Sequence, residues 1–316
     1  MIQVLIAFLF VTISNDFGQR SEGLLDFLPK EAILVVPEEP KGTEAVQFYD
    51  FDQDGTDEAI VTYELKAKEQ PAPSQFGVIV LKKENSSWKK IWETSVQGVG
   101  LHYSGLADLT GDGVKEYVFG VTIGASVGNI LNIFEWEELS FRTIGDIPYH
   151  RLELLEHEKM GLAVWQRYLA DAYFVDVLSW DGEQFVFDEE LFTAYYPTIE
   201  AFVKERIANM NAWFYWYTLA DAQIKANLFK KAKRSIQEGI KIAKRSSVTE
   251  AIDLFKQLKE KLKKEKRDIN KMTDGEPRKS ALGMHRAYFF KETGQKSSRE
   301  ITFCPVLTMK TLSFRG

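Results

Sequence analysis

Cysteine is nearly absent from this chain, since Cys304 is the only one among its 316 residues. A single thiol excludes an intrachain disulfide and any metal site built from several cysteines. Histidine is scarce as well, and His102, His150, His157 and His285 show no metal-ligand spacing. No P-loop or Rossmann fingerprint occurs. The sequence therefore predicts no catalytic or cofactor-binding residue of these common kinds, and we do not expect an enzyme.

Long apolar runs are also missing. The apolar stretch at residues 2–13 is too short to cross a bilayer as a helix, but it has the length of the hydrophobic part of a signal peptide. We therefore expect residues 1–22 to be an export signal, the mature protein to have no transmembrane span, and its location to be secreted or at the cell surface. No cysteine closely follows this stretch, so no lipid anchor is expected. A short buried strand and a misplaced start codon are the alternatives.

Basic residues are few in the first two thirds of the chain. Residues 1–200 contain 14 Lys and Arg against 34 Asp and Glu, a net charge of −20, whereas residues 201–316 contain 26 against 12, a net charge of +14. This split predicts a domain break near residue 197. A hydrophobic content of 45% allows packed cores in both parts. We expect a connector at 23–43, a β-repeat domain at 44–196, a helical domain at 197–270 and a poorly ordered tail at 271–316.

An acidic loop occurs twice in the first part. Its first copy places Asp50, Asp52, Asp54 and Glu58 at positions 1, 3, 5 and 9, with Gly55 at position 6 and the Thr56 carbonyl at position 7. Its second copy places Asp108, Thr110, Asp112 and Glu116 at the same four positions, with Gly113 at position 6 and the Val114 carbonyl at position 7. Short oxygen-bearing side chains at alternating positions can converge on one hard cation, and glycine permits the tight turn. We therefore predict that both loops bind Ca²⁺.

The flanking residues distinguish these loops from EF-hands. An EF-hand needs a carboxylate at position 12, where this chain has Val61 and Phe119 within β-type runs. We therefore expect ions held between strands, with tighter binding at the first loop because it offers four carboxylates against three. The alternative is a pair of Asp- and Gly-rich hairpin turns without an ion.

The two loops belong to a larger repeat. Units at about 44–98 and 101–149 each contain a loop and several strand-like runs, and a third unit at 150–196 keeps the strands but has residues 156–161 in place of the loop. A hairpin turn is expected at Asp181-Gly182. Such units are similar to propeller blades, and three are too few for a usual closed ring. One alternative is that the strand-like run at 32–36 and the rest of the connector supply part of another blade, and the other is an open array. We predict an α+β fold in which about three blade-like antiparallel units form an open array, followed by an α-helical bundle that caps it.

At Asp50–Glu58 and Asp108–Glu116 the chain resembles the FG-GAP and VCBS repeats of integrin-α-like propellers, whose loop reads D-x-[DN]-x-D-G-x-x-[DE]. Phe119-Gly120 is similar to the Phe-Gly of that family. The resemblance implies a propeller-like fold stiffened by Ca²⁺, with any activity residing elsewhere. The chain departs from the family at Thr110 and in its third unit. Its layout is also similar to that of uncharacterised exported proteins of Gram-positive bacteria.

Helical spacing dominates the basic part. We expect a helix over 198–227 opened by Pro197, a second helix over 228–245 and a third capped by Ser247 in a Ser-Val-Thr-Glu motif. The residues Trp216, Leu219, Ala220, Ala232 and Ile236 resemble a single tetratricopeptide repeat, which implies protein or peptide binding. The alternative is an ordinary bundle packed on the β region. The aromatic run at 213–217 is expected to pack partly against that region.

These features favour a calcium-stabilised binding or structural module over an enzyme. The expected partner is a protein, a peptide or a cell-wall polysaccharide, and not a nucleic acid, because the Lys-rich run at 256–267 is typical of a solvated helix face. One alternative is a polysaccharide-acting hydrolase in which acidic residues such as Asp171 and Asp176 converge in a cleft. Another is a helical protein–protein adaptor.

Overall fold

The computed structural model describes residues 23–68, 72–138 and 140–272. The export signal predicted at 1–22 and nearly all of the tail predicted at 271–316 lie outside the described residues. Within the described part, antiparallel strands occupy the chain as far as Phe187, and α-helices follow as far as Met272. The prediction of an α+β fold with its strands first is therefore confirmed, and the described strands close into neither a barrel nor a propeller.

The strands form three antiparallel sheets that follow one another along the chain. The first contains β1 (Ile33–Leu34), β2 (Val46–Tyr49), β3 (Glu58–Leu65), β4 (Ser74–Glu84) and β5 (Ser87–Gly98). The second contains β6 (Gly100–Ala107), β7 (Glu116–Gly124), β8 (Gly128–Glu137) and β9 (Ser140–Tyr149). The third contains β10 (Arg151–Leu155), β11 (Gly161–Arg167), β12 (Tyr173–Trp180) and β13 (Phe185–Phe187). Consecutive strands pair within the second and third sheets, and in the first sheet both β1 and β2 pair with β3.

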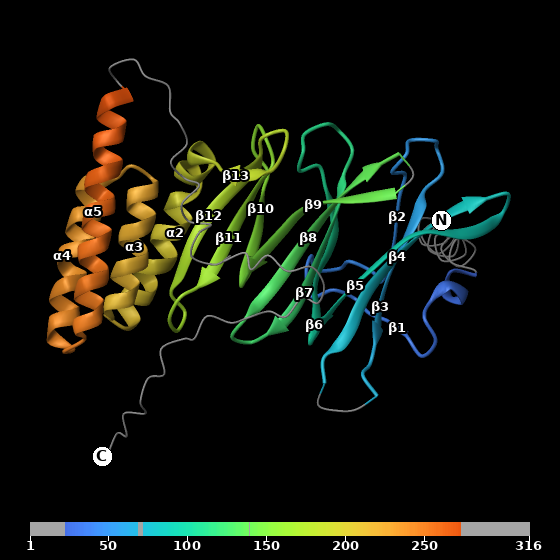
Figure 1. Ribbon diagram of the computed structural model, residues 1–316, viewed down its shortest axis with the longest axis horizontal. Helices are drawn as coiled ribbons and strands as arrows, with labels where there is room; N and C mark the ends of the chain where they lie inside the picture. The colour runs from blue at the N-terminus through green and yellow to red at the C-terminus, as the bar shows by residue number, and fades with distance from the viewer. Residues whose placement is uncertain (1–22, 69–71, 139, 273–316) are drawn as a thin grey trace, which may run out of the picture.

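The three sheets follow one another along the long axis of the molecule, with the helices at one end and the 3-10 turn η1 (Leu24–Phe27) at the other (Figure 1). Two apolar cores join them. Residues such as Val78 and Phe119 pack between the first and second sheets, and residues such as Leu131 and Val164 pack between the second and third. The molecule is thus an open stack of sheets in which each sheet covers an apolar face of the next.

Strand β3 shows why part of the sequence reads as a continuous apolar run. Successive side chains of a strand point to opposite faces. Ile60 belongs to the core shared with the second sheet, whereas Ala59 and Val61 belong to a separate core around Leu24 of η1. Both faces of β3 are covered, so both alternate sets of side chains are buried.

The segment predicted as a connector, residues 23–43, takes part in the sheets. Its β1 extends the first sheet along the edge of β3. The amides of Glu38 and Glu39 donate to the carbonyls of Leu101 and His102 on β6. These bonds satisfy backbone groups that would otherwise be unpaired at two sheet edges.

Four α-helices follow the sheets: α2 (Glu189–Asn209), α3 (Trp213–Lys225), α4 (Phe229–Arg245) and α5 (Thr249–Met272). Helices α2 and α3 pack on the third sheet around Trp165 and Phe192. Helices α4 and α5 pack on α3 around Ile236 and Phe255. Gly239 allows α4 and α5 to approach closely, because a Cβ at this position would lie only 2.0 Å from Cζ of Phe255.

Helix α2 begins at Glu189, so the prediction of a helix opened by Pro197 is wrong. Asp188 is the N-cap, and its carboxylate accepts the Leu191 amide at 2.9 Å. Two glutamates in the first turn add favourable charge at the helix N-terminus. Pro197 therefore lies inside the helix, and the strands of the third unit end at β13.

The single helix predicted over 198–227 is two helices. The backbone leaves the helical conformation at Met210, where φ is −145°, and α3 follows after a short turn. Asn211 in that turn accepts a hydrogen bond from Nε1 of Trp216 at 2.7 Å. The turn redirects the aromatic run, so that Tyr217 contacts rings of both the third sheet and α5.

Ser247 does not cap the last helix as predicted. Its φ is 56°, and the amides of Ser247 and Val248 donate to the carbonyls of Lys244 and Ala243. This pair of bonds is the Schellman pattern that ends a helix. The serine therefore closes α4, and α5 begins at Thr249.

Candidate metal centre

The two acidic loops occupy equivalent places in the first and second sheets. The first connects β2 to β3, and the second connects β6 to β7. At position 2 of each loop, a buried apolar residue, Phe51 or Leu109, enters an inter-sheet core. Its amide donates to the carboxylate at position 9, from Phe51 to Glu58 at 2.8 Å and from Leu109 to Glu116 at 2.6 Å. The glutamate thus ties the start of each loop to the strand that follows.

The backbone follows the same path in both loops. Positions 4 and 6 have positive φ values: 58° at Gln53 and 87° at Gly55 in the first loop, and 79° at Gly111 and 92° at Gly113 in the second. The sequence predicted the glycine at position 6. It gave no signal for the left-handed conformation at position 4 of the first loop, because that position is a glutamine and not a glycine. In both loops the aspartate at position 1, Asp50 or Asp108, accepts two loop amides. The bond from the amide at position 6 is common to both loops, whereas the other comes from position 5 in the first loop and from position 4 in the second.

The first loop brings three of its predicted metal ligands together. Carboxylate oxygens of Asp50, Asp52 and Glu58 lie within 4.8 Å of one another. Calcium binds oxygen at about 2.3 to 2.6 Å, so opposite ligands of one ion are about 5 Å apart. The three carboxylates therefore fit one Ca²⁺. Asp54 accepts the amide of Thr56 at 2.8 Å, which orders the turn beside them.

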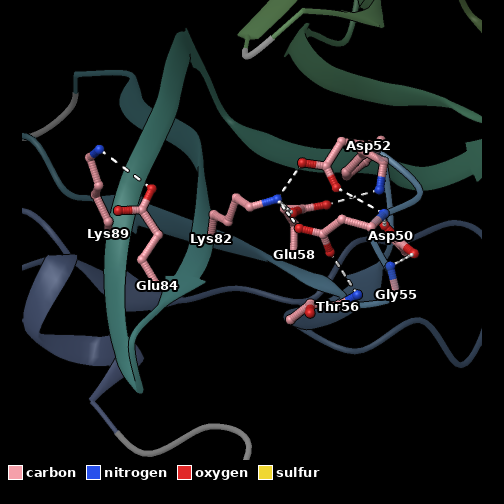
Figure 2. Close-up of polar contacts among 10 residues, drawn as sticks. Asp50, Asp52, Gly55, Thr56, Glu58, Lys82, Glu84 and Lys89 are labelled. Atoms are coloured by element: carbon pink, nitrogen blue, oxygen red, sulfur yellow. Dashed lines mark hydrogen bonds and ion pairs between the residues drawn. The ribbon is translucent and has the colours of Figure 1, made fainter.

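Lys82 on β4 is a part of this centre that the sequence pattern does not reveal. Its ammonium contacts Asp52, lies 2.7 Å from Oδ2 of Asp54 and lies 3.3 Å from Oε1 of Glu58 (Figure 2). The pairing of β3 with β4 explains this position, because the residue that follows Leu81 comes beside Glu58. Only the strand register connects Lys82 with the acidic loop.

Burial and charge act in opposite directions on these groups. Glu58 has no exposed surface, and burial raises the pKa of its carboxyl, whereas the Phe51 amide and Lys82 lower it. Among the described residues, Oε1 of Glu58 accepts no hydrogen bond and has only the ion pair with Lys82. Burial alone would lower the pKa of Lys82, but hydrogen bonds to Asp52 and Asp54 outweigh it and raise that pKa. The centre therefore attracts positive charge, and Lys82 is charged.

The second loop is arranged differently. Glu116 accepts two loop amides at Oε2 and the hydroxyl of Thr110 at Oε1, the latter at 2.9 Å. Burial raises the pKa of this carboxyl as well. Asp112 accepts the amide of Val114 at 2.8 Å. In the described part of the chain, Asp108, Asp112 and Glu116 form no compact group like that of the first loop. Most of the predicted ligands of this loop therefore bond to the loop itself.

The acidic residues considered for a hydrolytic cleft take part in structural contacts. Asp171 accepts a hydrogen bond from the Tyr215 hydroxyl and lies 2.7 Å from Nε of Arg206, and Asp176 lies 2.7 Å from Nζ of Lys225. A shallow hollow elsewhere is lined by Glu189, Glu190, Thr193 and Ala194. Its two glutamates are consecutive on α2, so their side chains diverge by about 100° around the helix axis. They are not the facing pair that glycoside hydrolysis requires.

Comparison with protein-family models gives no match, and comparison with the curated proteins gives none either. The resemblances to FG-GAP and VCBS repeats and to a tetratricopeptide repeat therefore rest on the residues quoted for them. In the part of the chain that the structure describes, no helix combines the length and apolar character needed to cross a membrane.

Proposed function

We propose that this chain is an exported, calcium-stabilised β-repeat protein that serves as a binding or structural module at the cell surface. The observation that carries the proposal is the group formed by Asp50, Asp52 and Glu58, whose oxygens have the spread that one hard cation requires. The repetition of the same turn in the second loop supports a role for these loops in the fold.

Calcium at the first loop would act on the packing of the sheets. A bound ion supplies two positive charges to acidic groups that otherwise repel one another. Asp50 and Asp52 lie at the start of the loop and Glu58 begins β3, so an ion shared among them joins the two ends of the loop. Between them, Phe51 stacks with Trp136 of the second sheet. Binding would therefore stabilise the contact between the first two sheets.

The sheet arrangement supports a propeller-like interpretation. The second and third sheets are four-stranded antiparallel meanders, which is the build of a propeller blade. In the proposed arrangement the three sheets are blade-like repeats related to FG-GAP and VCBS repeats, and they form an open array. Helices α2 and α3 cover the last sheet and remove the need for a further blade.

The proposed location and partners rest on different parts of the chain. Export rests on the signal-like pattern at residues 1–22. The proposed partner is a protein, a peptide or a cell-wall polysaccharide. A second candidate, a helical protein–protein adaptor, is favoured by the hairpin of α3 and α4, which Asn227 closes with a φ of 58°. The ion pairs of Asp171 and Asp176 leave the hydrolase alternative without a supporting observation.

Thermal melting of the full chain, in chelator and in about 5 mM Ca²⁺ or Mg²⁺, tests the proposal. For dissociation constants of about 10⁻⁴ to 10⁻³ M, this calcium concentration adds about 1 to 2 kcal/mol of stability and raises Tm by several degrees. The double variant Asp52→Ala/Asp112→Ala removes one ligand from each loop and should lose the rise. Asp146→Ala/Asp253→Ala removes two exposed aspartates outside the loops and should keep it. A wild-type Tm that calcium does not raise contradicts the proposal.

A further inference from the structure

Strand β4 supplies a cation, Lys82, to the first loop. The ammonium of Lys82 lies among three of the four carboxylates that the loop offers to a metal. Its side chain is only 16% exposed, so these contacts are part of a packed site. Figure 2 shows Lys82 extending from β4 into the loop, whereas Glu84 and Lys89 pair with each other away from it.

The ammonium and a calcium ion require the same oxygens. Asp52 and Glu58 contact Lys82 and also belong to the three-carboxylate group. Glu58 is fully buried, and its Oε1 has no hydrogen bond among the described residues, only the ion pair at 3.3 Å. A buried carboxylate in this state needs a cation beside it. Two cations at this distance would repel each other strongly, so a calcium ion could enter only if Lys82 moved away.

The second loop has the opposite charge at the equivalent position. Loop position 10 pairs with Leu81 of β4 in the first sheet and with Phe134 of β8 in the second. Lys82 and Glu135 directly follow these partners, so they occupy equivalent places. Glu135 forms an ion pair with Arg142 of the neighbouring strand. At this equivalent position, the first loop has the positive charge of Lys82 beside it, whereas the second loop has the negative charge of Glu135.

We infer that Lys82 is the resident counter-cation of the first loop and sets its calcium affinity. The ammonium holds the loop together when calcium is scarce, and Ca²⁺ has to displace it in order to bind. This inference rests on the proposed calcium function. It changes the expectation that four carboxylates make the first loop the tighter site, because the lysine neutralises part of their charge.

Calorimetric titration of Ca²⁺ into full-length variants tests the inference. All variants carry Asp112→Asn, which weakens the second loop, so that the heat reports the first. Lys82→Met removes the charge and should lower the dissociation constant at least about tenfold. Lys82→Arg keeps a positive charge that can pair with the same carboxylates, so it should not lower the dissociation constant below that of its parent. Lys83→Met, at the next residue of β4, removes a lysine that lies over the Trp88 ring and should also leave the affinity unchanged.

A melt in chelator gives a second measurement that does not depend on metal binding. Lys82→Met should melt at a lower temperature than its parent and than Lys83→Met, because the carboxylates have lost their cation. Calcium should restore its Tm, and a Lys82→Met chain that folds only with calcium also supports the inference. Calcium binding by Lys82→Met but not by its parent would also support the inference. That result would contradict the proposed calcium-binding function of the native loop.

Equal dissociation constants for Lys82→Met and its parent overturn the inference and leave the proposed function standing. An absence of calcium binding by every variant and by the unmodified chain overturns both. The two failures are therefore distinguishable in one set of titrations.

Discussion

Replacing Lys225 with methionine tests how firmly the helices are joined to the third sheet. The Lys225 ammonium, at the end of α3, lies 2.7 Å from Asp176 on β12 and 3.1 Å from Asp221 on its own helix, and it donates to the Val175 carbonyl at 2.9 Å. Asp221 also lies 2.8 Å from Lys261 of α5. Burial alone would raise the pKa of Asp221, but the charges of Lys225 and Lys261 outweigh it and hold the pKa below its usual range. Lys225 thus links the sheet to α3, and Asp221 extends the network to α5 through Lys261.

The expected loss in the free energy of unfolding depends on the carboxylates that lose their partner when Lys225 becomes methionine. The side chains of Lys225 and Asp221 are 6% and 7% exposed, and removing one partner of a buried ion pair costs about 3 to 5 kcal/mol. Asp176 is 39% exposed and can regain water, and Asp221 keeps Lys261 as a partner. These two effects reduce the cost, so the free energy of unfolding should fall by about 2 to 3 kcal/mol.

Urea unfolding of the full chain, followed by circular dichroism and by tryptophan fluorescence, measures this change as a lower midpoint at unchanged m. Coincident transitions by the two probes would establish that the free energy is well defined. Lys231→Met is the control, because Lys231 on α4 is 46% exposed and its pair with Glu200 should be worth less than about 1 kcal/mol. A loss for Lys225→Met no larger than that for Lys231→Met would refute the reasoning.

Three further outcomes follow from the contacts of Asp188, Gly239 and Glu116. Burial alone would raise the pKa of Asp188, but hydrogen bonds led by that from Lys159 outweigh it and lower the pKa. The stability this carboxylate gives is therefore complete above its unfolded pKa of about 3.9 and is lost as the pH falls below it, so Asp188→Asn should flatten the decrease of Tm between about pH 5 and pH 2.5. An unchanged slope would count against this assignment. Gly239→Ala should lower the free energy of unfolding in urea by about 1 to 3 kcal/mol, despite the better helix propensity of alanine, because the added methyl group meets the Phe255 ring. A more stable variant would mean that α4 and α5 are packed less closely. Glu116→Ala should cost about 1 to 3 kcal/mol in chelator, since it leaves buried loop amides unpaired, and a loss seen only with calcium would instead assign Glu116 to the metal.

Regular spacing in the sequence predicted the parts of the fold that local pattern controls. The two acidic loops, with glycine at position 6, occupy equivalent turns, and the hairpin expected at Asp181-Gly182 joins β12 to β13. The helices were recognised from their apolar spacing, and the helix predicted over 228–245 agrees with α4. The start of α2 and the break between α2 and α3 were not predicted. Asp188 followed by two glutamates is a recognisable signal for the start of a helix. The start was instead predicted at Pro197, because proline is also common in the first turn of a helix.

Other features depend on contacts between distant residues and could not be read from spacing. Ser247 fits a capping box locally, but the path from α4 to α5 places it in a left-handed conformation. Lys82 lies 24 positions after Glu58 and joins the candidate centre only because β3 and β4 pair in one particular register. Glu116 was predicted as a metal ligand from its position in the loop, and its hydrogen bonds to that loop become visible only in three dimensions.

Counting the calcium ions bound to the purified chain tests the proposed metal centre most directly. The full chain is stripped with chelator, dialysed against about 5 mM Ca²⁺, and its calcium content per chain is measured by elemental analysis against the dialysis buffer. The three-carboxylate group of Asp50, Asp52 and Glu58 predicts about one or more bound ions per wild-type chain, and fewer for Asp52→Ala/Asp112→Ala. A wild-type calcium content equal to that of the double variant, or no higher than that of the buffer, would contradict the proposed calcium site.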